Sequence, residues 1–242
     1  VKDLATEIPT DFETAGSAVG EVNTRFGLTG QALDDLSAKF IKFASLNDTD
    51  VSTSVDNVSS VLNAFGQSTN DAGNLLDALN ATGQATGISM DTLANDLSQN
   101  AAQFKEMGLT AQEAAGFMGM VEMSGLDTST AMAGLKKAMK NAADDGISLD
   151  DAMKNFSETM NSNASDTDKL SAAYDLFGSK AGAAIYNVVQ TGKLNLDDLS
   201  GSLGDFAGSV DNTFNETLDP IDQFQMTLNS LKEVGADIGN SL

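Results

Sequence analysis

The sequence predicts an all-α fold, a multi-helix bundle or array of short amphipathic helices joined by Gly-containing turns. Three observations support this prediction. Apolar residues recur every three to four positions over most of the chain, as they do on one face of a helix. Only 2 of the 242 residues are Pro, which leaves long stretches free of helix breakers. Several of the 22 Gly residues stand where one apolar stretch ends and the next begins.

Residues 1–30 show the weakest periodicity and are mostly small and polar, with Pro9 among them. We expect a loosely ordered lead-in there, with at most one short helix. A helical core domain is expected over 31–209. A linker over 210–220 and the start of a further helical segment, to 242, are expected after it. The chain begins without an initiator Met and ends inside a helical pattern, so we expect a fragment of a longer polypeptide.

Apolar spacing predicts the helices of the core domain one after another. The first covers 33–46 and the second 51–65. Several β-branched residues in the second would allow a strand, but spacing of three to four residues favours a helix over strict alternation. Further helices are predicted over 75–79, 93–104, 170–177, 184–189 and 199–206, with a break near Gly178 and a last amphipathic segment over 224–238, after Pro220.

Helix starts are predicted where a hydroxyl side chain precedes an acid by three positions, because the pair can cap free amides at a helix N-terminus. Such pairs are Ser68 with Asp71, Thr110 with Glu113, Ser148 with Asp151, and Ser165 with Asp168. Gly followed by an apolar and then a polar residue precedes several starts, at Gly87, Gly108, Gly125 and Gly146. This spacing of roughly 20 residues fits a structural repeat, and it fits good capping alone equally well.

Charge and composition narrow the range of functions. The formal net charge is −22, from 13 basic and 35 acidic residues, so the surface repels nucleic acid and anionic membranes. No stretch approaches the roughly 18 apolar residues that a membrane helix needs. Cys and His are both absent, which removes thiolate chemistry and the commonest general base and metal ligand. We therefore expect no cofactor and no metal centre.

Paired acids are the strongest candidates for catalytic residues, and we do not expect them to act as such. A glycosidase holds two carboxylates across a cleft, whereas sequence neighbours on a helix do not face each other. The sequence around Gly146 resembles a calcium loop, but Ala143 and Ala152 stand where ligand oxygens are required. The chain is therefore expected not to be an enzyme. The acid pairs are Asp34–Asp35, Asp144–Asp145, Asp150–Asp151 and Asp197–Asp198.

A group of methionines at helical spacing is the candidate partner-binding site. Filling of the core is the ordinary role of such residues. Met side chains also form adaptable grooves that hold a partner helix, and this alternative stays open. The candidate residues are Phe117, Met118, Met120, Met123, Met132 and Met139.

Five short runs follow one another along nearly the whole chain. They cover 21–36 (EVNTRFGLTG, then LDDL), 127–138 (DTST, then GLKKA), 176–182 (LFGSKAG), 192–199 (GKL, then LDDL) and 213–220 (TFNETLDP). In this order they resemble the conserved core region of lactococcal-type phage tail tape measure proteins.

The resemblance implies a structural, mostly helical virion component whose length sets the length of a siphophage tail and which assists DNA ejection. It implies tail tube protein, tail assembly chaperones and distal tail or baseplate hub proteins as partners, and a homo-oligomer in the tail lumen. During assembly the protein would be in the host cytoplasm. The resemblance supplies no catalytic residues and no cofactor. A helical interaction module that binds a tail or secretion-like partner through its Met-rich helices is the alternative.

Overall fold

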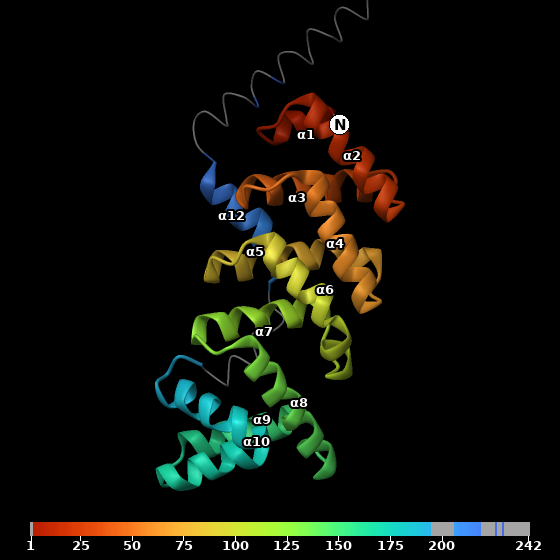
Figure 1. The fold of residues 1–242 in the computed structure, drawn as a ribbon. Helices are drawn as coiled ribbons and strands as arrows, with labels where there is room; N and C mark the ends of the chain where they lie inside the picture. The colour runs from red at the N-terminus through yellow and green to blue at the C-terminus, as the bar shows by residue number, and fades with distance from the viewer. Residues whose placement is uncertain (1, 195–205, 219–225, 227–228, 230–242) are drawn as a thin grey trace, which may run out of the picture. The chain divides into compact units, whose positions relative to one another are not determined.

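The computed structural model describes residues 2–194 and 206–218, together with positions 226 and 229. Every regular element in this part of the chain is a helix, so the predicted all-α fold is confirmed (Figure 1). The elements are α1 (Lys2–Glu7), α2 (Phe12–Phe26), α3 (Gln31–Leu46), α4 (Val51–Phe65), the 3-10 turn η1 (Thr69–Asp71), α5 (Ala72–Thr86), α6 (Met90–Glu106), α7 (Ala111–Ser124), α8 (Thr128–Asp144), α9 (Leu149–Asn161), α10 (Asp166–Gln190) and α12 (Ser209–Thr217).

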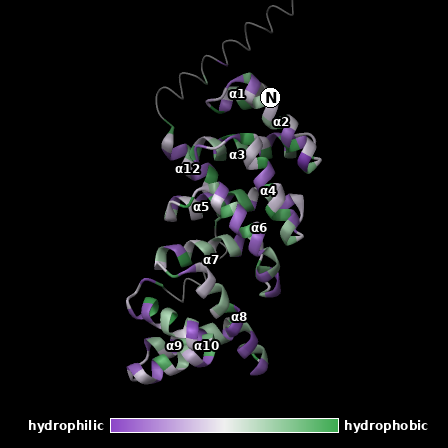
Figure 2. Ribbon diagram, in the orientation of Figure 1, coloured by the Kyte–Doolittle hydropathy of each residue, from purple (hydrophilic) through white to green (hydrophobic). Residues whose placement is uncertain are grey.

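The described residues fall into two compact units. Unit 1 comprises those of Val1–Gly83, Ile88–Gln99 and Phe206–Leu242, and unit 2 those of Gln84–Gly87 and Asn100–Asp205. Most helices in Figure 2 carry both hydrophobic and hydrophilic residues. In such amphipathic helices the apolar face packs into the core. Most of the predicted helix 199–206 and of the segment 224–238 lies outside the described residues.

The predicted Gly turns have a common geometry. Gly108, Gly125 and Gly146 adopt φ values of 77°, 69° and 73°, which a residue with a side chain rarely adopts. The amide of the next, apolar residue donates to a carbonyl five positions back, as in a Schellman motif. These bonds are Leu109 to Phe104 (3.0 Å), Leu126 to Val121 (3.2 Å) and Ile147 to Ala142 (3.0 Å).

The predicted helix starts are also confirmed. The Thr110 hydroxyl accepts from the Glu113 amide at 3.2 Å, and the Glu113 carboxylate accepts from the Thr110 amide at 2.8 Å. Ser68 and Asp71 form the same reciprocal box at η1. The hydroxyls of Ser148 and Ser165 accept from the amides of the acids three positions on. Helix boundaries in this chain are therefore largely set by local hydrogen bonds.

The first 30 residues differ from the loosely ordered lead-in that the sequence predicted. The Asp11 carboxylate accepts from the Thr14 amide at 2.7 Å and starts the 15-residue helix α2. The apolar residues of α2 are small and widely spaced, which made the pattern weak, yet Ala15, Val22 and Phe26 are buried. The Phe26 ring stacks on Phe40 of α3 at 5.7 Å between centroids. This segment is therefore part of the unit 1 core.

A linker was expected over 210–220, but most of its described residues are helical, because Ser209–Thr217 forms helix α12. Val210 is fully buried and Phe214 is 4% exposed. Figure 1 shows α12 beside α3, although about 170 residues separate them in the chain. The ammonium of Lys42 on α3 pairs with Asp211 at 2.6 Å and lies 5.6 Å from the centre of the Phe214 ring. Apolar burial and an ion pair together hold α12 on unit 1.

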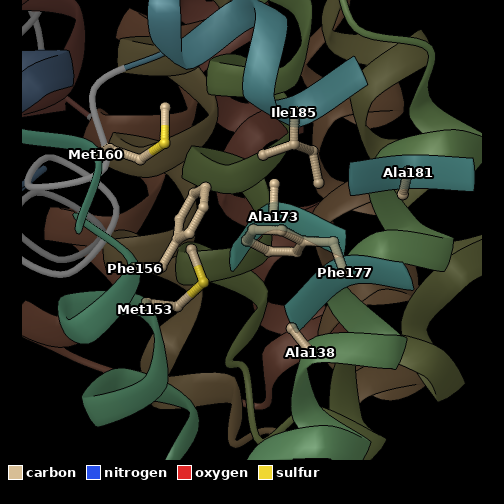
Figure 3. Close-up of a cluster of buried hydrophobic side chains, with 8 residues drawn as sticks. All are labelled: Ala138, Met153, Phe156, Met160, Ala173, Phe177, Ala181 and Ile185. Atoms are coloured by element: carbon tan, nitrogen blue, oxygen red, sulfur yellow. The ribbon is translucent and has the colours of Figure 1, made fainter. Parts of the chain in front are cut away.

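The core of unit 2 is formed by α8, α9 and α10 and is drawn in Figure 3. The rings of Phe156 and Phe177 meet edge to face, with centroids 5.0 Å apart. Helix α10 is broken at Gly178, where φ is 77° and ψ is 165°, as the sequence predicted. After the break the chain returns so closely that a Cβ atom on Gly182 would lie 2.6 Å from the Ala173 carbonyl oxygen. Glycine therefore permits the close approach of the two halves of α10.

Candidate partner-binding site

Helix α7 carries most of the predicted Met cluster and is apolar around nearly its whole circumference. The Thr110–Glu113 box starts it, and Gly125 ends it with φ at 69°. Its buried residues fall on several faces: Ala111, Ala114, Ala115, Phe117, Met118, Gly119, Val121 and Ser124. A helix that is apolar on several faces is surrounded by neighbours rather than laid on a surface. Most of α7 is therefore buried, and Met123 and Glu122 are its exposed residues.

The six candidate residues do not form one exposed surface. Phe117, Met118 and Met132 are buried, with exposed fractions of 7% or less, and this is the core-filling role. Met120 and Met139 are half-buried. Met123 is 63% exposed, and an exposed large apolar side chain is the more informative observation. The partner-binding prediction therefore rests chiefly on Met123, with Met120 beside it on the same helix.

A small cavity lies next to this part of α7, within unit 2, and its volume is about 30 Å³. Among the described lining residues Ser124 alone is polar, and its hydroxyl donates to the Val121 carbonyl at 2.7 Å. A cavity this small and apolar holds at most about one water and is expected to be dry. It can accept part of an apolar side chain but no cofactor. Its lining is Phe117, Met120, Val121, Ser124, Leu126, Ala131, Leu135, Met153, Phe177, Ile185 and Leu194.

The sequence did not reveal the cavity residues that come from α9 and α10. Phe177 and Ile185 lie on α10, on either side of the break at Gly178 where its two halves fold back on each other, and Met153 comes from α9. The break was predictable from Gly178, but the position to which the second half returns was not. Contacts between residues distant in the chain depend on helix packing, which apolar periodicity does not specify.

Several acids near the helix ends make local hydrogen bonds in the structure. The Asp35 carboxylate accepts from Gln31 at 2.7 Å, one turn earlier on α3. Hydrogen bonds from Ser129 and Thr130 lower the pKa of Asp127 at the start of α8, and a hydrogen bond from Lys140 lowers the pKa of Asp144 at its end. Asp197 and Asp198 lie outside the described residues. In the described part of the chain, no three acidic side chains gather closely enough to hold a metal ion.

These features are those of a helical protein that acts through contacts between helices. Comparison with known protein families identifies such a family. A model of the phage-related minor tail protein family matches residues 1–231. The chain belongs to this family. It is therefore a structural protein of a phage tail. No curated protein and no solved structure matches it. None of the described helices of this tail protein has the length and apolar character of a membrane span.

Proposed function

We propose that this tail protein acts as a tape measure, the ruler that sets the length of a phage tail. The observation that carries the proposal is the family match over 1–231, along which the tape-measure-like runs follow one another in order. A ruler needs a defined rise per residue, which an α-helix supplies at about 1.5 Å. The capped helices described above provide such a rise, and the Gly turns between them provide positions at which the chain can open.

The proposed location is the tail lumen, after assembly in the host cytoplasm. The partners proposed there are tail tube protein, tail assembly chaperones, distal tail or baseplate hub proteins, and further copies of the chain. A net charge of −22 suits a lumen protein that leaves ahead of the genome, because like charge keeps it from binding DNA. In this role the protein acts through length and contacts and performs no catalysis.

Changing the length of this chain in the phage tests the ruler directly. If all 242 residues run as helix along the tail axis, in-frame deletion should shorten the tail by about 360 Å. Tandem duplication should lengthen it by the same amount. Tail lengths measured by negative-stain electron microscopy give both values. Tails of normal length from both phages would refute the ruler role for this chain, and the duplication still tests it if the deletion prevents tail formation.

A second function is favoured by Met123. We propose that α7 also holds a tail partner at this residue, because an exposed methionine on a helix that borders an apolar cavity suits an adaptable helix contact. Purified tail tube, distal tail and chaperone proteins are each tested for capture by the immobilised chain. Met123→Lys should weaken capture of the one that binds by about tenfold. Glu122→Gln, which changes the charge by the same amount at the neighbouring exposed position, is the control. Equal capture by wild type and Met123→Lys would leave only the ruler role.

A further inference from the structure

A groove separate from the α7 cavity lies in unit 2, where α8 ends beside α9 and the first half of α10. Its volume is about 280 Å³. This is slightly below the roughly 300–1,000 Å³ of pockets for drug-sized ligands, so its size suits one or two side chains rather than a whole cofactor. Its lining is Asn141, Asp145, Ile147, Ala152, Asn155, Phe156, Thr159, Ala172, Asp175 and Leu176.

The base of the groove is apolar, and one large apolar side chain, Ile147, is exposed in it. Ala152 and Phe156 are buried beneath it, and Phe156 belongs to the core shown in Figure 3. Ile147 lies at the groove with 38% of its surface exposed. The turn after α8 holds Ile147 in this place, because its amide donates to the Ala142 carbonyl at 3.0 Å. A rigidly placed, exposed isoleucine is a suitable contact for an apolar side chain of a partner.

The groove also gathers negative charge from two helix ends. Helix α8 ends at Asp144, with Asp145 as its C-cap and no basic residue in its last turn. The first half of α10 ends at the break at Gly178, shortly after Asp175. The Asn141 side-chain amide connects the two ends by donating to the carbonyls of Asp175 (2.6 Å) and Leu176 (3.0 Å). Carbonyl dipoles make each C-terminus negative, so acids at these positions are unfavourable and cations are favoured.

In the described part of the chain, the basic side chains near the groove compensate Asp144 but pair with neither Asp145 nor Asp175. No Lys or Arg is among the described residues of its lining. The Lys140 ammonium pairs with Asp144 on α8, and the methylene groups of Lys137 lie against Gly178. Lys154 on α9 is exposed and also stands outside the lining. Both described carboxylates of the groove, Asp145 and Asp175, are exposed and can accept a bond from a partner.

We propose that this groove binds a segment of a partner protein that presents an apolar side chain next to Lys or Arg. The apolar side chain would rest on Ile147 and Phe156, and the cation would approach Asp145, Asp175 and the carbonyl ends of the two helices. A second copy of the chain is disfavoured as the partner, because each copy has a net charge of −22. The proposal is independent of the ruler role, since it concerns a surface of the isolated chain.

A designed peptide tests the proposal on the full 242-residue chain. The probe is a fluorescein-labelled helical peptide of Leu at positions i, i+4 and i+7, with Lys between them. Its affinity is measured by fluorescence anisotropy at physiological salt. Two matched peptides, one with Glu in place of Lys and one with Ser in place of Leu, should each bind at least about tenfold more weakly. The Ile147 methyl signals in NMR spectra should shift with the Leu–Lys peptide.

Variants separate groove binding from diffuse attraction to an acidic protein. Asp145→Asn with Asp175→Asn should weaken the Leu–Lys peptide by about three- to tenfold, and Ile147→Ser by a similar factor. Glu122→Gln with Glu216→Gln removes two exposed carboxylates elsewhere and should change the affinity by less than about twofold. Circular dichroism establishes that each variant is folded. Equal weakening by both pairs of variants, an unmoved Ile147 signal, or no binding of the Leu–Lys peptide would each overturn the proposal.

Discussion

Replacing Asp77 with Ala is expected to lower the free energy of unfolding of unit 1 by about 3–5 kcal/mol, the cost of removing one member of a buried ion pair. Asp77 on α5 is 2% exposed and pairs with the Lys39 ammonium of α3 at 2.6 Å. Its carboxylate also accepts from the backbone amides of Gly208 (2.9 Å) and Val210 (3.0 Å), at the start of α12. The substitution leaves a poorly solvated ammonium and two amides without this acceptor.

Urea unfolding followed by circular dichroism measures this loss. The matched control is Asp56→Ala in the same unit, because Asp56 pairs with Arg25 at the same distance of 2.6 Å but both side chains are about half exposed. Exposed pairs of this kind contribute about 0–1 kcal/mol. A loss for Asp77→Ala no larger than that for Asp56→Ala would mean that the buried pair does not hold unit 1 together.

Hydrogen exchange locates the effect of Asp77→Ala on α12. Helix α12 has only 9 residues, and an isolated helix of that length is not stable in water. Its amides should therefore lose protection when the Asp77 contacts are removed. Asn80 on α5 donates to Ser209 (2.9 Å) and Thr213 (3.2 Å) and keeps part of the docking surface intact.

Much of the fold was predictable from sequence because its determinants are local. The Thr110–Glu113 box and the left-handed Gly at position 125 define α7 within a span of 16 residues, and both can be recognised without tertiary structure. The same reasoning predicted the break at Gly178. At both ends of α7 the residues that make the hydrogen bonds are separated by five positions or fewer.

The docking of α12 was not predictable by the same means. In the sequence, Asp77 is one acid among 35, and nothing near it indicates that it meets Lys39 and the amides of residues 208 and 210. Segments 1–30 and 210–220 were expected to be irregular because their apolar residues are few or small. Tertiary packing stabilises α2 and α12, as with Phe26 on Phe40 and Phe214 beside Lys42.

The candidate site was predictable in composition but not in exposure. Helix α7 is apolar on most faces, so its sequence offers no polar face from which to infer which Met points outward. Met118 and Met123 have the same residue type and lie on the same helix, yet one is 4% and the other 63% exposed. Their difference arises from which faces of α7 the neighbouring helices cover. That information belongs to packing and not to the spacing of apolar residues.

Replacing Phe177 with Ala is expected to lower the free energy of unfolding of unit 2 by about 3–5 kcal/mol, because it removes a large side chain from a packed core. Phe177 is 4% exposed, meets Phe156 edge to face at 5.0 Å, and borders the existing cavity of about 30 Å³. Removing the ring would join new empty space to that cavity. The helices around it are tied by caps and by Asn141, so they can collapse little and the loss should approach the upper value.

Tyrosine fluorescence during urea unfolding reports on unit 2, because the chain has no Trp and both of its tyrosines, Tyr174 and Tyr186, lie in α10. Met123→Ala is the matched control, since it also shortens a large apolar side chain in unit 2 but at an exposed site, where changes stay within about 0.5 kcal/mol. If Phe177→Ala costs less than about 1 kcal/mol, the two halves of α10 must repack across the lost ring. The break at Gly178 would then be a flexible joint and not a fixed feature of the unit 2 core.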